Sequence, residues 1–213
     1  MKPFVLLNSY PVPIDRTDVD TDAILPKQYM ALTSRVGFGD YLFDNWRYTE
    51  AGEPGDDVTK RKKQPDFPLN QFRYQGAQIM LCRANFGCGS SREHAVWALA
   101  DWGIRAIIAP SYGDIFYGNC FKNGVLPIKL ATPIVDELFN DLTPGEELTF
   151  MTIDLPEQRV VCQGGKSYPF DVDASRKHFL LSGLDEIGQI LACYSERIKA
   201  FEKSHFAAEP WVA

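Results

Sequence analysis

Short apolar segments alternate with helical patterns between residues 78 and 130, and no other feature constrains the fold of this chain so strongly. A continuous apolar run covers residues 79–82, and a second run, interrupted only by Arg105, covers residues 104–109. The intervening residues 91–102 carry apolar side chains at the three- and four-residue spacing of a helix. Strands joined through helices pair in parallel with right-handed crossovers. The sequence therefore predicts an α/β domain with a partly parallel sheet flanked by helices.

The rest of the chain is predicted to extend this domain rather than to form a second one. The further predicted elements are an extended start at 4–7, a turn-rich segment at 11–22, a helix at 114–122, strands at 125–130, 147–153, 159–162 and 168–172, and helices at 174–181 and 185–202. Residues 50–67 have the composition of a long exposed loop, and residues 184–213 are predicted to form a C-terminal helical extension. We therefore expect a single domain over residues 1–213.

The chain has 213 residues and a formal net charge of −6. Nucleic acids and anionic membranes demand a basic surface, so this charge argues against both as partners. The basic run at residues 60–63 lies in the predicted loop and is interpreted as a solvated segment. No signal sequence is recognisable, and no apolar stretch approaches the roughly 18 residues of a membrane span. The sequence therefore predicts a cytoplasmic protein.

The five cysteines are widely spaced, at Cys82, Cys88, Cys120, Cys162 and Cys193. An odd number without a Cys-x-x-Cys pair indicates reduced thiols rather than a disulfide framework, a zinc site or a ferredoxin-like cluster. Most are interpreted as small buried apolar residues. No metal or cofactor is predicted in this chain.

Four aspartates between residues 15 and 22 only superficially resemble a calcium loop. An EF-hand counted from Asp15 needs glycine at position six and glutamate at position twelve, where this sequence has Asp20 and Pro26. The carboxylates, including Asp22, are instead expected to cap turns and a following helix and to hold the N-terminal loop.

Residues 85–95, Asn-Phe-Gly-Cys-Gly-Ser-Ser-Arg-Glu-His-Ala, hold the densest set of chemically useful side chains. They follow a predicted strand and open a helix, where free backbone N–H groups and the positive end of the helix dipole favour an anion. Gly87 and Gly89 permit close approach of the backbone to a ligand. Arg92 has the planar donor geometry that clamps a carboxylate. The segment is predicted to bind a carboxylate or a phosphate.

Three interpretations of this segment stay open on the residues alone. Ser90 and Glu93 match a capping box, which would make the segment purely structural. The Gly-x-Gly pattern suggests a dinucleotide-binding loop, although Arg92 stands where the third glycine is expected. The third interpretation is an acid–base site for a small polycarboxylate, in which the helix N-terminus and the arginine stabilise a serine alkoxide.

Four ordered motifs resemble one known family. Residues 85–95 resemble the Gly-Ser-Ser-Arg-Glu signature of the aconitase superfamily, in the form found in isopropylmalate dehydratase small subunits. Residues 18–28, 37–47, and 109–119 with 123–127 resemble further motifs of that family in the same order. Because they span nearly the whole chain, the four motifs are far more specific together than any one of them alone.

The resemblance implies a fold, a reaction and a partner. The fold is a swivelling β/β/α domain like the fourth domain of aconitase, supplied as a separate chain. The reaction is a hydro-lyase step of leucine biosynthesis that interconverts 2-isopropylmalate and 3-isopropylmalate through 2-isopropylmaleate. The implied partner is a large subunit that carries a 4Fe-4S cluster, and the lack of cluster-spaced cysteines here agrees with that division.

The resemblance also implies roles for individual residues. Ser90 would be the general base that takes a proton from the carbon next to a carboxylate, although the sequence does not decide between Ser90 and Ser91. Ser91 and Arg92 would bind that carboxylate and stabilise the charge that develops on it. His94 is expected to pack or cap, and Cys88 is assigned no catalytic role.

Residues 37–43 are expected to set the substrate preference. Leu42 and Phe43 are predicted to form an apolar wall against the alkyl group, and Arg35 is a candidate for a further carboxylate contact. One methylene in such a pocket changes binding by only about 1–3 kcal/mol, so citramalate and homoaconitate are alternative substrates. A non-catalytic anion-binding module is the alternative outside the enzymes.

Overall fold

The computed structural model describes residues 1–32, 36–142, 148–184 and 186–212. Its strands are β1 (Leu6–Ser9), β2 (Pro11–Ile14), β3 (Ile79–Cys82), β4 (Ala106–Ala109), β5 (Leu126–Lys129), β6 (Met151–Asp154), β7 (Arg159–Cys162) and β8 (Ser167–Pro169). Its α-helices are α1 (Thr21–Ile24), α2 (Asp44–Arg47), α3 (Glu93–Trp102), α4 (Asp114–Lys122), α5 (Thr132–Asn140), α6 (Ala174–Ser182) and α7 (Glu186–Ala208). Short 3₁₀ helices are η1 (Lys27–Ala31), η2 (Phe38–Tyr41), η3 (Pro68–Asn70), η4 (Phe72–Tyr74) and η5 (Pro210–Val212).

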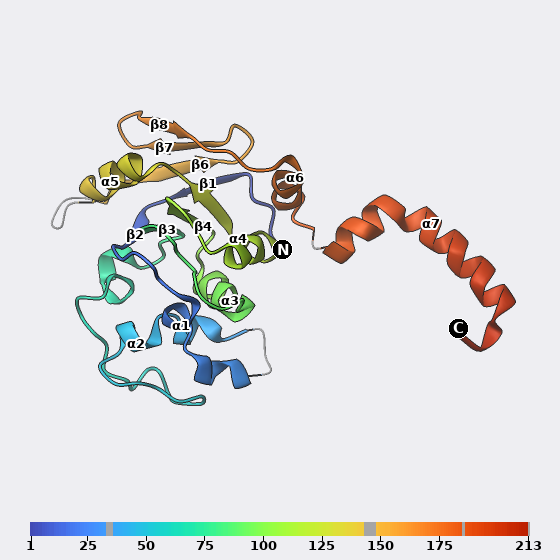
Figure 1. Cartoon of the computed structure of the whole chain (residues 1–213), viewed down its shortest axis with the longest axis horizontal. Helices are drawn as coiled ribbons and strands as arrows, with labels where there is room; N and C mark the ends of the chain where they lie inside the picture. Colours follow the sequence, from blue (N-terminus) through green and yellow to red (C-terminus); the bar gives the residue numbers. More distant parts are fainter. Residues whose placement is uncertain (33–35, 143–147, 185, 213) are drawn as a thin grey trace.

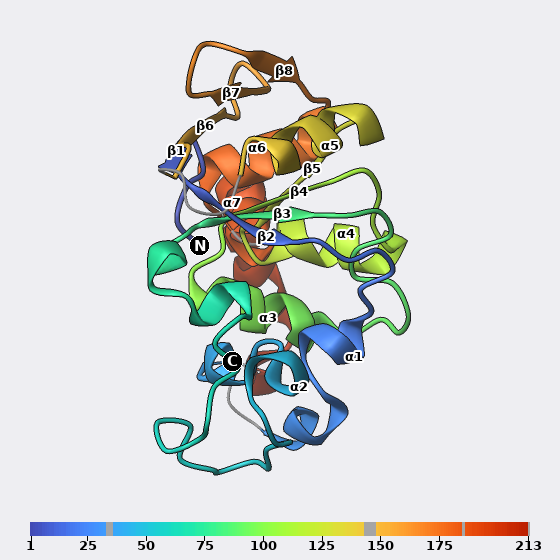
Figure 2. The same cartoon turned by 90° about the vertical axis from the view of Figure 1, so that its left-hand side faces the viewer.

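The strands form two separate sheets. The order β2-β3-β4-β5 is parallel throughout, and the order β1-β6-β7-β8 is antiparallel throughout. Figures 1 and 2 show the antiparallel sheet at one end of the molecule, the parallel sheet in the middle, and α1 and α3 beyond it. The predicted α/β class with a parallel sheet flanked by helices is confirmed, and the later strands form the second layer.

Two apolar clusters lie on the two faces of the parallel sheet. The residues of β3 alternate between them: Met80 and Cys82 belong to the cluster under α1 and α3, whereas Ile79 and Leu81 belong to the cluster shared with β6 and β7. All four are fully buried. A strand buried on both faces needs an unbroken apolar run, and this is why the sequence shows no alternation there.

The prediction of a turn-rich segment is wrong at residues 11–14, where β2 pairs in parallel with β3. Pro11 and Pro13 obscured this strand in the sequence, because proline cannot donate to the ladder and is usually read as a breaker. β2 lies at the edge of the sheet, where one row of N–H groups has no strand partner. Proline is therefore tolerated in this position.

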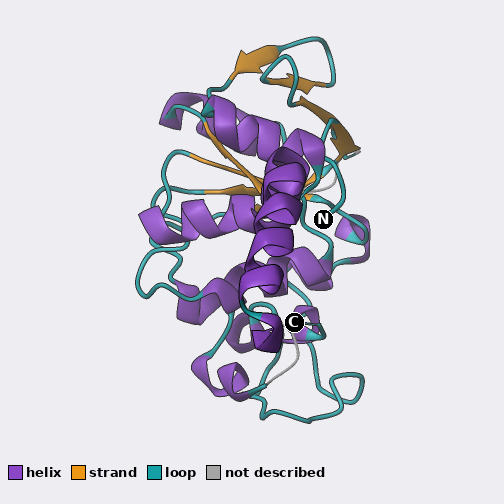
Figure 3. Cartoon of the chain, turned by 90° about the vertical axis from the view of Figure 1, so that its right-hand side faces the viewer, coloured by secondary structure: helices purple, strands orange, loops and turns teal. Residues whose placement is uncertain are grey.

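Residues 50–67 contain no helix or strand, as predicted for a long loop, although an isolated bridge joins Tyr48 to Lys63. The C-terminal helix α7 has 23 residues and extends away from the two sheets, as Figure 1 shows. In Figure 3, seen from that side, it lies in front of the rest of the chain. None of the helices within the described ranges is long and apolar enough to cross a lipid bilayer.

Candidate active site

The serine–arginine loop, residues 85–92, connects β3 to α3 and lies between two other segments of the chain. On one side the Gly87 N–H donates to the carbonyl of Val19 at 2.7 Å, and Asp20 forms a parallel bridge with Cys88. On the other side the Phe86 N–H donates to the carbonyl of Ser111 at 3.1 Å. The fold thus brings together three of the four sequence motifs, which lie dozens of residues apart in the chain.

The capping-box interpretation is wrong. Helix α3 begins at Glu93 with Arg92 as its N-cap, two residues after the predicted start, and no side chain caps it. The Arg92 N–H donates instead to the carbonyl of Ser90 at 2.8 Å, and the Glu93 carboxylate accepts from Asn123 Nδ2 at 2.9 Å. Ser90 therefore lies outside the helix, and its hydroxyl does not cap it.

Ser90 and Ser91 are exposed at the N-terminal end of α3. The Ser90 Oγ lies 3.3 Å from Thr21 Oγ1, and Thr21 Oγ1 donates to the Ser90 carbonyl at 3.1 Å. The positive end of a helix dipole stabilises negative charge that develops beside it. The loop therefore presents two hydroxyls where a carboxylate or an alkoxide is favoured.

Arg92 is the cation of this loop. Its side chain is 20% exposed, and its Nη1 pairs with the Asp22 carboxylate on the first turn of α1. Asp20 caps α1 by accepting from the Ala23 N–H at 2.7 Å, as the aspartate-rich sequence predicts. Ser90, Ser91 and Arg92 are consecutive in the chain; the two serines are exposed and the arginine is partly exposed.

Neither Cys88 within the loop nor His94 just after it has the surroundings of a reactive side chain. Burial, followed by the charges of Asp20 and Asp18, raises the pKa of the Cys88 thiol, so this cysteine is not activated as a nucleophile. The His94 ring lies 4.5 Å from the Trp97 ring and 5.6 Å from the Phe38 ring, centroid to centroid. The packing role expected for His94 agrees with these contacts.

The segment 37–47 is fixed to α3 and to itself by polar contacts. The Asp101 carboxylate on α3 accepts from the backbone N–H groups of Gly37 and Gly39, both at 2.9 Å. The Arg47 side chain is buried, and its Nη1 donates to the carbonyls of Gly39, Asp40 and Leu42 at 3.1–3.2 Å. Burial lowers the pKa of this guanidinium. This segment is therefore a rigid part of the domain.

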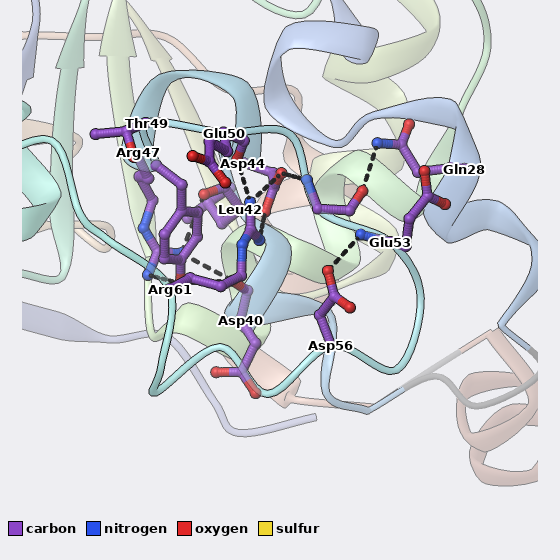
Figure 4. A network of polar contacts seen from close by, with 12 residues as sticks. Gln28, Asp40, Leu42, Asp44, Arg47, Thr49, Glu50, Glu53, Asp56 and Arg61 are labelled. Atoms are coloured by element: carbon purple, nitrogen blue, oxygen red, sulfur yellow. Dashed lines mark hydrogen bonds and ion pairs between the residues drawn. The ribbon is translucent and has the colours of Figure 1, made fainter.

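A largely buried ion pair ties the long loop to the same segment. Asp44 is fully buried, accepts from both Nη atoms of Arg61 and accepts from the Gly52 N–H at 3.2 Å (Figure 4). Figure 4 also shows the Arg47 guanidinium beside this pair. Sequence analysis missed the network, because Arg61 lies in a basic run that is otherwise typical of a solvated loop.

The structure corrects the expectation for Leu42 and Phe43. Both side chains are fully buried, and the Phe43 ring stacks on Trp46 at 5.4 Å. They belong to the apolar cluster under α1 and α3, so neither offers a surface to an alkyl group in this structure. They lie in the core because removing two large apolar side chains from water is strongly favourable. Arg35 lies outside the described residues.

Gly87 tests how tightly the serine–arginine loop is built. Its φ is +72°, and a Cβ at this position would collide with the buried Phe116 ring. We expect Gly87→Ala to lower the free energy of unfolding by about 2–4 kcal/mol, from overpacking together with left-handed backbone strain.

Gly118→Ala in α4 is the matched control. No atom lies within 4 Å of its Cβ position, so it should leave stability unchanged or raise it slightly. Urea unfolding compares them, and equal midpoints would contradict the expected collision.

The described residues of this chain offer no ligand set for an iron–sulfur cluster or another metal. Within the described ranges no three His, Cys, Asp or Glu side chains are grouped as a metal would require. Cys82, Cys120 and Cys162 are buried, and Cys193 is exposed on α7. The cluster that the sequence resemblance implies has no ligand set in the part of the chain that is described.

Comparisons with known proteins agree on one family. The model of the aconitase C-terminal domain family matches residues 1–133, and a model described as LeuD_N matches residues 136–174. A 3-isopropylmalate dehydratase small subunit of Neisseria gonorrhoeae is 54% identical over 212 residues, which cover 100% of this chain and 99% of that protein. The protein of the same name from Neisseria meningitidis is 53% identical with the same coverage.

A solved structure supports the fold independently. The crystal structure of a 3-isopropylmalate dehydratase from Methanocaldococcus jannaschii matches with a TM-score of 0.60, over 93% of this chain and 98% of that chain. Its sequence identity of 23% makes this a likeness of fold alone. The full-length relatives and the family model are the decisive observations. The chain therefore belongs to the aconitase C-terminal domain family and, within it, to the 3-isopropylmalate dehydratase small subunits.

Proposed function

We propose that this chain supplies the proton-transfer half of an active site that interconverts 2-isopropylmalate and 3-isopropylmalate through 2-isopropylmaleate, in leucine biosynthesis. The observation that carries the proposal is the exposed pair of serine hydroxyls at the N-terminus of α3, immediately before the partly exposed Arg92 in the chain. A hydroxyl, a cation and a helix N-terminus together are what a substituted malate needs for carboxylate binding and proton removal.

Each residue of the serine–arginine loop has a distinct task in this scheme. Arg92 and the Ser91 hydroxyl bind the carboxylate next to the carbon that loses its proton. The deprotonated Ser90 Oγ takes that proton, and the hydroxyl on the adjacent carbon departs, which leaves the double bond of 2-isopropylmaleate. Returning the proton and the hydroxyl to exchanged carbons completes the isomerisation, because together they make up the one water that was lost. The helix dipole and Arg92 lower the energy of the serine alkoxide that this step requires.

The site needs a second chain to be complete. Ser90 and Ser91 face solvent in this chain, whereas an alkoxide requires a site from which water is excluded. Helix α7 adds large exposed apolar side chains, at Ile187, Ile190, Leu191, Tyr194 and Phe201, which are typical of a surface that another protein covers. We therefore propose a cytoplasmic complex with a large subunit that holds the 4Fe-4S cluster.

Anaerobic reconstitution tests this function. The chain, a cluster-loaded large subunit and their mixture are assayed separately for 2-isopropylmaleate by its ultraviolet absorbance, with 3-isopropylmalate as substrate. We expect activity in the mixture only, because each chain holds part of the site. Activity of the large subunit alone would contradict the shared site.

Substrate choice is tested in the same mixture. Citramalate and homoaconitate are compared with 3-isopropylmalate by kcat/KM, and we expect 3-isopropylmalate to be preferred. A cluster-loaded mixture that acts on citramalate or homoaconitate but not on 3-isopropylmalate would assign the chain to the related hydro-lyase. Inactivity on all three would leave only anion binding as its role.

A further inference from the structure

Helix α1 contributes two consecutive side chains to the serine–arginine loop, and the sequence predicted a part in the active site for neither of them. Thr21 contacts Ser90, and Asp22 contacts Arg92. The two residues that the proposed function places at the reacting atoms are therefore both held from one short element, which lies about seventy positions earlier in the chain.

Thr21 has one hydroxyl proton and two acceptors within reach. Its Oγ1 lies 3.1 Å from the carbonyl of Ser90 and 3.3 Å from the Ser90 Oγ, and the residue is only 2% exposed. A threonine hydroxyl donates one hydrogen bond and accepts others, so it cannot donate to both atoms at once. While Ser90 carries its proton, the Ser90 hydroxyl can donate to Thr21, and Thr21 can donate to the carbonyl.

Loss of the Ser90 proton changes this arrangement. An alkoxide can only accept, and the buried Thr21 hydroxyl is a donor already in place beside it. Rotation of that single proton from the carbonyl to the Ser90 Oγ would stabilise the developing charge without any movement of heavy atoms. Donors fixed in advance at developing charge are the main way in which enzymes lower such barriers.

Asp22 holds Arg92 through only part of the guanidinium. The contact runs from Nη1 to the carboxylate, and within the described residues neither Nε nor Nη2 has a hydrogen-bond partner. Arginine has five N–H donors in a rigid fork. A second carboxylate can therefore bind the remaining edge while Asp22 fixes the orientation of the group. The Asp22 side chain is 49% exposed, so the pair itself adds little to the stability of the fold.

The position of α1 is itself well determined. The Asp20 side chain caps it, the Thr21 N–H donates to the carbonyl of Cys88 at 3.0 Å, and the Phe43 N–H donates to the carbonyl of Ile24 at 2.7 Å. The helix is therefore attached to the serine–arginine loop at one end and to the segment 37–47 at the other. Its two polar side chains have little freedom to point elsewhere.

We propose that Thr21 and Asp22 are positioning residues of the active site. Thr21 donates the hydrogen bond that stabilises the Ser90 alkoxide, and Asp22 orients Arg92 for the substrate carboxylate. This inference rests on the proposed function, because it assigns their tasks through Ser90 and Arg92. The two residues act on different steps, so their substitutions should separate in the kinetics.

Thr21 is tested by Thr21→Val and Thr21→Ser in the complex reconstituted with the large subunit. Valine keeps the shape and removes the hydroxyl, so we expect kcat to fall about 10–100-fold with KM within about twofold. Serine restores the donor and should recover most of the lost kcat. A Thr21→Val complex with wild-type kcat, or one that Thr21→Ser does not rescue, would overturn the assignment.

Asp22 is tested by Asp22→Ala and Asp22→Asn in the same complex. Alanine releases the guanidinium, so we expect KM to rise about tenfold with a smaller change in kcat, because substrate binding precedes proton transfer. Asparagine keeps an acceptor oxygen and should be intermediate. A KM that stays unchanged would overturn the proposal, and a KM that falls would show that Asp22 competes with the substrate instead.

A control variant and a measurement on the chain alone keep the two proposals distinguishable. Glu137→Gln breaks the exposed pair with Lys166 in the antiparallel layer and should change neither KM nor kcat. If the wild-type complex is inactive on every substituted malate, the kinetic assay contradicts the proposed function. The Arg92 Nε–Hε NMR signal of the isolated chain then still reports on the contact. It should shift in Asp22→Ala but not in Glu137→Gln, and an unshifted signal would overturn the positioning role.

Discussion

A Ser90→Ala complex is expected to turn over about 10²–10⁴-fold more slowly than the wild-type complex, with KM nearly unchanged. That range is what a positioned general base contributes to a proton transfer. Alanine removes only the Oγ, and Arg92 and Ser91 still bind the substrate carboxylate in this scheme. The loss should therefore appear in kcat rather than in KM.

Two further variants make this measurement specific. Ser91→Ala is expected to act mainly on KM, because its proposed task is carboxylate binding, and the comparison decides which serine is the base. Ser167→Ala on β8 removes an exposed hydroxyl from the antiparallel layer and should have wild-type kinetics. A Ser90→Ala complex with kcat within about threefold of wild type would exclude Ser90 as the base. If Ser91→Ala then shows the large loss, the two roles exchange.

Asp44→Ala is expected to lower the free energy of unfolding by about 2–4 kcal/mol. Asp44 is 0% exposed and Arg61 is 12% exposed, so removal of the carboxylate leaves a largely buried guanidinium without its counter-charge. The loss of the acceptor for the Gly52 N–H adds to this cost. Urea unfolding of the isolated chain measures the change, and the melting temperature should fall by about 5–15 °C.

The exposed pair between Lys60 and Asp57 is the matched control, because it lies in the same loop with side chains 83% and 48% exposed. Asp57→Ala should change stability by no more than about 0.5–1 kcal/mol. In the double variant Asp44→Ala with Arg61→Leu, no charge is left unpaired, so part of the lost stability should return. Equal effects of Asp44→Ala and Asp57→Ala would mean that burial does not govern the pair. If the double variant recovers no stability, the lost hydrogen bond from the Gly52 N–H would account for the effect of Asp44→Ala instead.

Prediction from the sequence succeeded where local pattern and packing agree. Helix α4 over residues 114–122 and strand β7 over residues 159–162 match the predicted ranges at both ends. Both are bounded by clear signals, such as Gly124 after α4. It failed at β2, where two prolines concealed an edge strand. Of the three interpretations left open for residues 85–95, the structure excludes the capping box, a local pattern that the fold does not use.

The candidate site divides in the same way. Its chemistry was visible in the sequence, because Ser90, Ser91 and Arg92 are adjacent and the resemblance to one family names them. Its supports were not visible. Thr21, Asp22 and the Asp44–Arg61 pair contact partners 17 to 70 positions away, and nothing in their local sequence indicates those partners.

The sequence by itself therefore determined the fold class, the family and the chemical character of the loop before α3. It could do so because apolar periodicity and contiguous motifs are local properties of a chain. Only the tertiary structure decided that Leu42 and Phe43 are buried in the core, that Arg61 is largely buried in a pair with Asp44, and that α1 contacts both Ser90 and Arg92. These outcomes depend on burial and on which distant segments meet, and both are fixed only when the whole chain packs.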